Sequence, residues 1–380
     1  MSTSAASPER TDVIHAQLEE VRRAGPGAPL AARDPVNLPM INNWVEAMQD
    51  ANPVYIDESA ARAAGFDGPV APPAMTMVWT MIGLHAKRPA NDPLGRAMAV
   101  MDEADYGSVV ATNCQQTYHR YLRHGEHLTV QRALAEVSGP KQTRLGEGWF
   151  LTTRETWYAA AEPVAEMLFR VLKFAPQPAG ADDRRPEFAD ISSEQQTQLP
   201  RMTISATPTF IIASAMATRD FEDVHHDRDS AIRRGSRDIF LNILTDLGLV
   251  ERFVTDWAGP IARIRNIAVR LHVPCYAYDT LEFTGQVSSA KQNETVFVRA
   301  RGELGDHIVS AVGVTPGVSS RRPVIGRPRP AGEGPASLAD ELGRRPADER
   351  GQANRGILAG HVPHRQPLLN LHPLGQAGCR

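Results

Sequence analysis

An ungapped internal match constrains the fold of this chain more than any other feature of its sequence. The stretch DANPVYIDESAARAAG at residues 50–65 lies over DFEDVHHDRDSAIRRG at residues 220–235 at a constant offset. Each stretch is followed by an apolar helical segment and then by several strand-like segments. A match of this kind, with the same order of elements after it, indicates a duplicated unit far longer than a solenoid repeat. We therefore expect two halves of similar fold.

The two halves differ in chemistry at one position of this match. Asp50 is paired with Asp220, but Tyr55 occupies the position of His225. The duplication is thus intact in shape and asymmetric in chemistry. Only the second half is expected to combine the Asp with a His.

Hydrophobic periodicity predicts an apolar helix and several strands in each half. In the second half, Ser236 is expected to cap the helix, and Asp238 to lie in its first turn, where an acidic residue suits the helix dipole. Apolar residues at helical spacing mark that helix: Ile239, Phe240, Ile243, Leu244, Leu247 and Val250. The other expected elements are second-half strands at residues 267–272, 280–288, 295–303 and 307–314, a first-half helix at residues 75–84, and first-half strands at residues 117–122, 127–137, 149–158 and 164–174.

Shifts in composition predict the domain boundaries. A stretch with Pro and charge but no hydrophobic period marks a linker at residues 177–201. Residues 319–380 are dense in Arg, Pro and Gly, so we expect a disordered, solvated tail rather than a basic surface for nucleic acid or membrane. An N-terminal extension at residues 1–33 and the halves at residues 34–176 and 202–318 complete the division.

Composition argues against several classes of protein. A formal net charge of -3 gives no reason to expect a nucleic-acid partner. Cys114, Cys275 and Cys379 form no CxxC pair, which argues against a disulfide framework or a thiolate zinc site and suits a reducing cytoplasm. No apolar run approaches the roughly 20 residues that span a bilayer, and the N-terminal stretch lacks the apolar core of a secretory signal. We expect a cytoplasmic protein without a membrane span.

The polar cluster around His225 allows three interpretations. A metal site is disfavoured because His225, His226 and Asp227 are consecutive, so their side chains diverge, and no HExxH pattern occurs. A capped surface loop, with Asp227 or Asp229 as the helix cap, remains open. We favour acid–base chemistry, in which Asp220 and His225 meet over one water. The sequence has no GxSxG, GxGxxG or Walker motif that would indicate a serine nucleophile or a nucleotide.

Several motifs resemble those of a known family. DFEDVH resembles the D-x-N-P-x-H signature of MaoC-like (R)-specific enoyl-CoA hydratases, and DANPVY keeps the Asn-Pro of that signature without its His. More narrowly, VHHD, DIFLNILTDLGLV and TDWAGP look like one subunit of actinobacterial enoyl-CoA hydratases of steroid side-chain degradation. NPVYIDE, YHRYLRHGEHL and VSGPKQTRLGEG look like the MaoC-type domain of the partner subunit. The chain therefore resembles a fusion of two subunits that elsewhere form a heterodimer.

The resemblance implies an α+β double hot-dog fold, in which each unit is an antiparallel sheet around a long helix. Residues 34–176 would form a degenerate unit and residues 202–318 the catalytic unit. The implied reaction adds water to a 2-enoyl-CoA and gives a 3-hydroxyacyl-CoA. Asp220 would deprotonate the water and His225 would protonate Cα. No cofactor or metal is implied, because coenzyme A is part of the substrate, and the fused pair could form a homodimer.

Two further sets of residues are predicted to surround the substrate. Backbone N–H groups at the N-terminus of the second-half helix would stabilise the thioester oxygen. The residues expected there are Ser236, Asp238 and Ile239. Small and apolar residues of the first half are expected to form a pocket for a bulky, steroid-type acyl group, although this half could instead be only a scaffold. The pocket residues are Ala71, Pro72, Ala74 and Met75.

Two other functions remain open. A hot-dog thioesterase would use a carboxylate and water on the same ester and would release free coenzyme A. A non-catalytic acyl-CoA-binding protein would not need Asp220 and His225 in register. The sequence fixes neither the acyl chain nor whether hydration or dehydration is the physiological direction.

Overall fold

The computed structural model describes residues 8–176, 197–290 and 293–315 of the chain. By its internal contacts the chain divides into a unit Met1–Pro323 and a second unit Val324–Arg380, which lies outside the described residues. The expected disordered tail at residues 319–380 also lies outside them, as does most of the expected linker at residues 177–201. Both therefore remain predictions.

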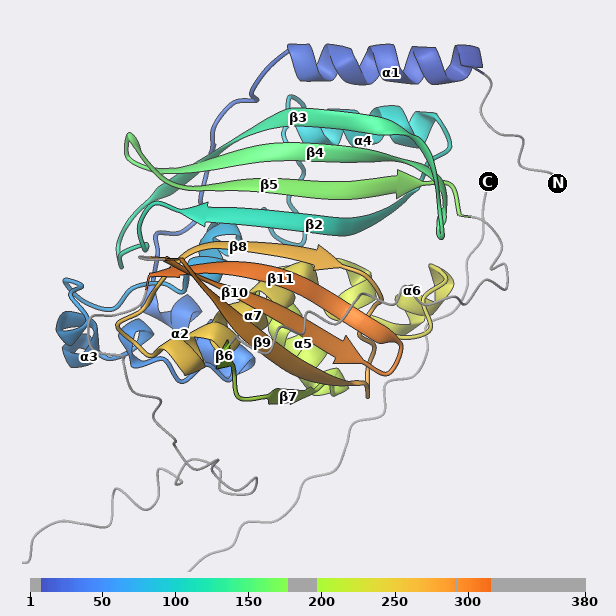
Figure 1. Ribbon diagram of the computed structural model, residues 1–380. Helices are drawn as coiled ribbons and strands as arrows, with labels where there is room; N and C mark the ends of the chain where they lie inside the picture. Colours follow the sequence, from blue (N-terminus) through green and yellow to red (C-terminus); the bar gives the residue numbers. More distant parts are fainter. Residues whose placement is uncertain (1–7, 177–196, 291–292, 316–380) are drawn as a thin grey trace, which may run out of the picture. The chain divides into compact units, whose positions relative to one another are not determined.

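The strands of both halves form one continuous antiparallel sheet (Figure 1). The order is β1-β3-β4-β5-β2-β8-β11-β10-β9-β6, and β7 pairs with β9. The halves join where β2 pairs with β8, from Asn113 opposite Arg270 to Thr117 opposite Asn266. The strands are β1 Leu30–Ala31, β2 Ser108–Tyr118, β3 Leu128–Thr143, β4 Gly146–Ala159, β5 Glu162–Phe174, β6 Thr197–Gln198, β7 Met202–Ser205, β8 Arg263–Leu271, β9 Thr280–Ala290, β10 Asn293–Gly302 and β11 Gly305–Thr315.

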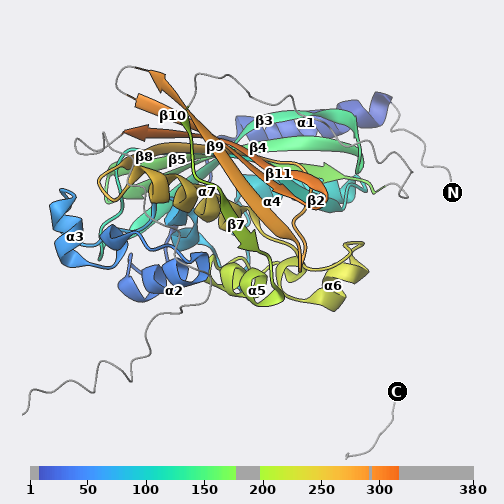
Figure 2. The same ribbon diagram turned by 60° about the horizontal axis from the view of Figure 1, so that its bottom comes forward.

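Helices of both halves lie together on one side of this sheet. Figure 2 shows α2 and α5 side by side below α7, in agreement with the contacts between them. The helical elements are α1 Pro8–Arg23, α2 Leu38–Met48, η1 Pro53–Tyr55, α3 Glu58–Ala63, η2 Pro73–Thr80, α4 Pro93–Glu103, α5 Pro208–Ala217, η3 Asp223–His225, α6 Arg228–Arg233 and α7 Ile243–Ala258. In the described part of the chain, no helix has both the length and the apolar character needed to cross a membrane.

The structure confirms the duplication element by element. The order α2, η1, α3, η2 in the first half recurs as α5, η3, α6, α7 in the second. Asp57 and Asp227 cap α3 and α6 in the same way, each accepting a hydrogen bond from a backbone N–H of the first turn. Gly65 and Gly235, which follow these short helices, both have positive φ, at 84° and 87°. A residue with a side chain would be strained at either position.

The central helices depart from the prediction at their boundaries. The second-half helix was expected to begin near Ser236, but α7 begins at Ile243 and its N-cap is Asn242, which accepts a hydrogen bond from the Thr245 N–H. The reason is tertiary: Phe240 forms a β-bridge with Tyr276, and this pairing keeps the preceding segment extended. The prediction of the cap at Ser236 was therefore wrong.

In the first half, the helix expected at residues 75–84 is the shorter 3-10 helix η2, which ends at Thr80. Met81 is already extended, and Gly83 has a φ of 86°. Pro73 at the first position and Pro72 before it suit a helix start, because the N–H groups there have no acceptor within the helix. The first half thus contributes a much shorter central element than the second.

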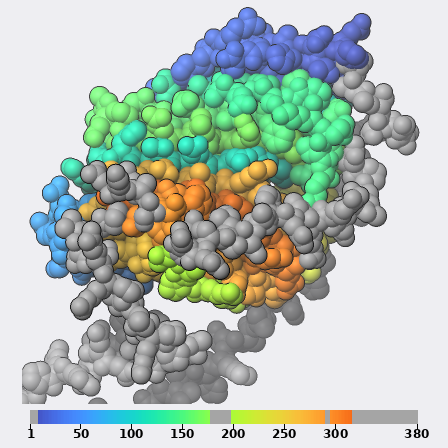
Figure 3. Space-filling model, viewed as in Figure 1, coloured from blue at the N-terminus to red at the C-terminus, as the bar shows by residue number. Residues whose placement is uncertain are grey.

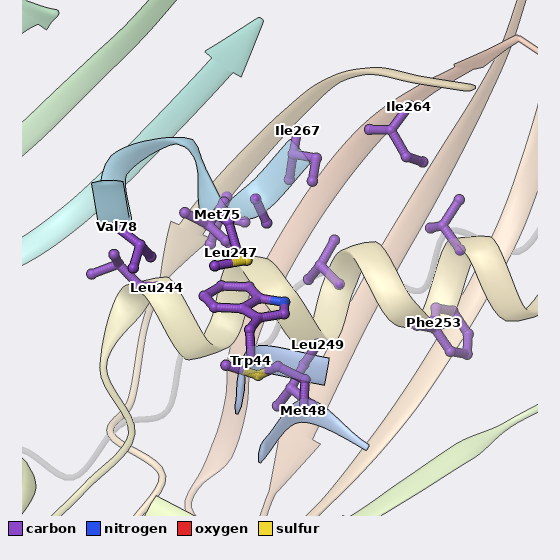
Figure 4. Close-up of a cluster of buried hydrophobic side chains, with 14 of the residues drawn as sticks. Trp44, Met48, Met75, Val78, Leu244, Leu247, Leu249, Phe253, Ile264 and Ile267 are labelled. Atoms are coloured by element: carbon purple, nitrogen blue, oxygen red, sulfur yellow. The ribbon is translucent and has the colours of Figure 1, made fainter. Parts of the chain in front are cut away.

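The central core is built around α7. Trp44 and Met48 of α2 pack closely on this helix at Gly248 (Figure 4). A Cβ at Gly248 would lie 2.8 Å from the Trp44 ring, so glycine permits the approach. Met75 and Val78 of η2 lie on another side of the same helix, which places α7 between the two halves.

A separate core lies against the first-half strands, on the face of β4 that also carries Trp157, whose Nε1 donates to Thr80 of η2. Ile14, Leu18 and Val21 of α1 pack with Leu94 and Met101 of α4 against residues of β3, β4 and β5. Figure 3 shows α1, in blue, along the top edge of these strands. Part of the expected N-terminal extension is therefore packed on the first half, and β1 within it pairs with β3.

Strand prediction was closest at the later strands of each half. The first strand of each half lies earlier than expected, at β2 Ser108–Tyr118 and β8 Arg263–Leu271. β2 has an irregular register between Ala111 and Asn113, and it buries the polar Gln116. Both features obscure the alternation of apolar and polar residues on which the prediction relied.

Candidate active site

The structure brings Asp220 and His225 together between α5 and α6. Asp220 follows Arg219, which has a φ of 57° and turns the chain at the end of α5, and His225 ends η3. His225 Nε2 lies 3.7 Å from Asp220 Oδ2. The two side chains are only 10% and 13% exposed, respectively. They form a nearly buried pair that is too far apart for a good direct hydrogen bond.

The backbone determines the orientation of the His225 imidazole. Its Nδ1 lies 2.8 Å from the carbonyl oxygen of Phe240, so Nδ1 carries the proton and donates it to that acceptor. The Phe240 ring meets the imidazole edge to face, with centroids 4.9 Å apart. Phe240 in turn is fixed by its bridge to Tyr276 and by its N–H, which donates to the Val224 carbonyl. Nε2 is thereby directed towards Asp220.

Burial makes Asp220 a stronger base than an exposed carboxylate. Removal from water raises the pKa of Asp220, and the nearby His225 partly offsets this rise. Its Oδ1 accepts a hydrogen bond from the Glu222 N–H at 3.3 Å, which fixes the carboxylate within its turn. The other oxygen, Oδ2, faces the imidazole.

The neighbouring polar residues have separate structural partners. His226 Nε2 lies 3.1 Å from the Phe221 carbonyl oxygen. Asp227 caps α6 by accepting from the Ser230 N–H. The capped-loop interpretation therefore holds for Asp227, while Asp220 and His225 remain paired with each other.

Ser236, Asp238 and Ile239 were predicted to surround the thioester oxygen at the N-terminus of the second-half helix. They lie before that N-terminus in the chain. The Ser236 hydroxyl donates to the Asp238 carbonyl, and the Asp238 carboxylate accepts from the Ile239 N–H. Asp238 also pairs with Arg228 at 3.3 Å. The N-terminus of α7 lies instead at Ile243, just beyond the Phe240 carbonyl that holds His225.

The corresponding positions of the first half are chemically different. Tyr55, at the position of His225, donates its hydroxyl to Glu251 Oε1 at 2.7 Å. The offset that pairs Asp50 with Asp220 pairs Pro73 with Ile243, and Pro73 has no N–H. It also pairs Ala74 with Leu244, and the Ala74 N–H donates to Glu251 Oε2 at 2.6 Å. The Glu251 carboxylate of α7 thus accepts the hydrogen bonds that Tyr55 and Ala74 donate in the first-half site.

Burial strongly perturbs the acids around this first-half site. Glu251 is 1% exposed, and removal from water raises its pKa to about 8. The pKa of Asp50 is raised to about 6, also mainly by burial. Burial and the adjacent Glu251 raise the pKa of Tyr55 well above its usual value, so Tyr55 stays protonated and acts as a donor. Sequence reasoning missed Glu251, although an acidic residue in the apolar stretch LGLVERFV is an unusual feature.

The residues predicted to form an acyl pocket are packed between the halves. Ala71, Pro72, Ala74 and Met75 are all buried. Figure 4 shows Met75 against α7. Their assignment to an acyl pocket remains a prediction.

Comparison with known proteins gives matches to both halves of a two-subunit enzyme. The family model of the FAS1-like dehydratase domain region matches residues 30–167. The alpha subunit of 3-oxo-4,17-pregnadiene-20-carboxyl-CoA hydratase of Mycobacterium tuberculosis is 54% identical over 177 residues, which is 47% of this chain and 56% of that subunit. The beta subunit of the same enzyme is 56% identical over 115 residues, or 30% of this chain and 89% of that subunit. The chain thus spans little more than half of the alpha subunit and most of the beta subunit.

A solved structure supports the fold. A MaoC-like dehydratase superimposes with a TM-score of 0.60 at 20% identity, covering 76% of this chain and 98% of that chain. This likeness concerns the fold alone. It confirms the predicted α+β double hot-dog architecture.

Proposed function

The chain belongs to the MaoC-like enoyl-CoA hydratase family, and we propose that it adds water to a 2-enoyl-CoA at a single site in its second half. The Asp220–His225 pair is the observation that carries this proposal. A separation of 3.7 Å suits one water that hydrogen-bonds both side chains. The first half has Tyr55 in place of the imidazole, so it contributes no second pair.

The pair can complete a balanced proton cycle. Asp220 Oδ2 takes a proton from the water, and the water oxygen forms a bond to Cβ of the enoyl thioester. The electron pair of the double bond moves towards the thioester oxygen, and His225, doubly protonated, gives its Nε2 proton to Cα. Asp220 is then neutral and His225 retains only the Nδ1 proton. A new water between the two groups returns the proton from Asp220 to Nε2.

The thioester oxygen needs hydrogen-bond donors while it carries enolate charge. We propose the N–H groups of Ile243 and Leu244 at the start of α7, because Thr245 already donates to the Asn242 side chain. The helix dipole adds to their effect. The first-half counterparts are Pro73, without an N–H, and Ala74, which donates to Glu251. Only the second half therefore offers both donors.

The difference in length between the central helices supports a bulky acyl group. α7 extends far enough to put Glu251 into the first-half site, whereas η2 ends at Thr80, before Met81 at the matching position. The side chain of Arg219, the residue before Asp220, reaches the chain beyond Thr80, since a Cβ at Gly83 would lie 3.5 Å from Arg219 Nη2. Among the described residues of the first half, no helix residue enters the second-half site as Glu251 enters the first-half site. We therefore propose that the acyl group lies along the Met81–Gly83 segment.

The proposed function can be tested against its two rivals in one assay. We would follow the enoyl-thioester absorbance and, in parallel, free thiol with a chromogenic thiol reagent. A hydratase removes the absorbance without releasing thiol. A thioesterase releases thiol, and an acyl-CoA-binding protein changes neither signal beyond one equivalent. Either of the last two results would contradict the proposal.

We expect a preference for a ring-containing 2-enoyl-CoA over crotonyl-CoA. Each additional buried CH₂ contributes up to about 0.8 kcal/mol, so partial burial of a ring system predicts a kcat/KM ratio well above tenfold. Met81→Trp should reduce this ratio by filling the proposed acyl region. Equal kcat/KM for the two substrates would refute the bulky-substrate proposal and leave the hydratase assignment intact.

The first-half site is expected to be catalytically silent. Asp50→Asn and Tyr55→Phe should each leave kcat within a few-fold of the wild-type value, because neither residue has an imidazole or a free helix donor beside it. Steady-state kinetics on crotonyl-CoA checks this. A loss as large as that caused by changing Asp220 would mean that the first half takes part in the chemistry.

A further inference from the structure

A second Asp–His pair is buried between the first turn of α7 and β11. His307 of β11 places Nε2 2.9 Å from Asp246 Oδ1 in the first turn of α7. The His307 and Asp246 side chains are 4% and 0% exposed, so this pair has no access to a substrate. At the matching position of the first half the chain has Thr76, whose hydroxyl donates to the Pro73 carbonyl. The acid is therefore present only in the half that holds Asp220 and His225.

The hydrogen bonds of His307 constrain its protonation. Nδ1 lies 2.6 Å from the Val273 carbonyl oxygen, which can only accept, so Nδ1 carries a proton. Nε2 faces a carboxylate, which also accepts. Burial alone would lower the pKa of His307, but the bonded Asp246 outweighs this effect and raises it. Both nitrogens of the imidazole are thus engaged by hydrogen-bond acceptors.

The two partners of His307 belong to the segments that hold the two parts of the active site, the start of α7 and the anchor of His225. Asp246 belongs to the turn of α7 whose first N–H groups face the substrate in the proposed mechanism. Val273 begins the loop in which the Cys275 carbonyl accepts from the Leu241 N–H. In the same loop Tyr276 bridges Phe240, whose carbonyl oxygen holds His225 Nδ1. His307 thus joins the helix end and the imidazole anchor to one strand.

On the basis of the proposed hydratase function, we propose that Asp246 and His307 are positioning residues for this reaction. They hold the start of α7 and the loop at residues 273–276 at a fixed spacing, and this spacing sets the direction of His225 and of the helix N–H donors. Neither residue touches the substrate. A displacement of about 1 Å at a catalytic group is enough to lower a rate by up to about a hundredfold.

The test separates positioning from simple stability. Removing His307 alone would leave the buried Asp246 carboxylate without the partner of its Oδ1. Its Oδ2 already has no hydrogen-bond partner among the described residues. The double variant Asp246→Leu/His307→Phe instead replaces the pair with apolar groups of similar size, a change that is often neutral or stabilising. We expect its Tm to be maintained, its kcat on crotonyl-CoA to fall about tenfold or more, and its KM to stay within about threefold.

Two matched variants complete the design. Asp246→Asn keeps a hydrogen bond to a neutral His307 and is expected to restore kcat to within about threefold of wild type. Thr76→Val, at the matching first-half position, should change neither kcat nor KM. If the double variant does not fold, His307→Gln decides the question. Its amide can reach Asp246 but cannot also donate to Val273, so kcat should still fall with KM maintained.

A spectroscopic readout keeps this test independent of the reaction itself. In protein with ¹⁵N-labelled histidine, the His225 Nδ1–H that donates to Phe240 should give a slowly exchanging signal, lost in the double variant. Wild-type kcat together with an unchanged His225 signal in that variant would overturn the positioning role. Absence of hydratase activity in the wild type would instead refute the proposed function, and the His225 signal would still report on the pair.

Discussion

Asp220→Asn and His225→Gln are each expected to lower kcat at least about a hundredfold, the usual scale for loss of an acid–base group. Asn keeps the Oδ1 acceptor for the Glu222 N–H but cannot take a proton from water. Gln can donate to the Phe240 carbonyl but has no proton to give to Cα. Steady-state kinetics on crotonyl-CoA, together with thermal unfolding, measures both effects. Tm should change little, because each variant keeps its backbone hydrogen bond.

The adjacent His226 provides a matched control for these variants. Its ring bonds the Phe221 carbonyl and not a group of the Asp220–His225 pair. His226→Gln should therefore retain kcat within a few-fold. If His226→Gln proved as damaging as His225→Gln, or if either variant of the pair kept near wild-type turnover, the assignment of the catalytic residues would be wrong.

The second large effect concerns stability and arises at Glu251. The pKa of this buried carboxyl is raised from 4.5 to about 8, so folding favours its protonated form. Its contribution to stability is fully present at acidic pH and is lost as the pH rises through about 8. The difference between the pKa of about 8 in the folded protein and the ordinary value of 4.5 corresponds to at most roughly 5 kcal/mol of unfolding free energy. The wild-type free energy of unfolding should therefore fall between about pH 5 and pH 9.

Two substitutions at Glu251 separate charge from hydrogen bonding. Glu251→Gln mimics the protonated acid, can serve both Tyr55 and the Ala74 N–H, and should gain stability over wild type as the pH rises. Glu251→Leu leaves both partners unsatisfied, each at a cost of about 1 to 3 kcal/mol. Asp50, whose pKa is raised to about 6, also lowers the free energy of unfolding as the pH rises, and it does so equally in wild type and in both variants. Parallel pH profiles for wild type and Glu251→Gln would show that the charge of Glu251 carries no stability cost.

The duplication and its asymmetry were predictable because they lie in short, local patterns. The match of residues 50–65 with residues 220–235 correctly predicted two halves with the same order of elements. The D-x(4)-H spacing correctly brought Asp220 near His225, since both lie in one turn-rich segment between two helices. Strands such as β10 and β11 were also close to prediction, because their alternation is regular.

Features that depend on distant partners were not predictable in the same way. The start of α7 moved to Ile243 because Phe240 pairs with Tyr276 across the fold, which no helical periodicity reveals. Glu251 acquires its role from Tyr55, 196 residues away in the chain. The acyl pocket was expected from the small side chains of the first half alone, and it remains a prediction; the packing of η2 against α7 of the other half lay outside that pattern.

The stereochemistry of water addition tests the central claim most directly. If one water lies between Asp220 and His225, the hydroxyl at Cβ and the proton at Cα are delivered from the same side of the double bond. A trans-2-enoyl-CoA hydrated in D₂O should then give a product in which deuterium and hydroxyl were added syn, as read from the proton coupling between C2 and C3. Syn addition of both groups is the predicted result. Anti addition, or a mixture of the two, would contradict a single water shared by this pair.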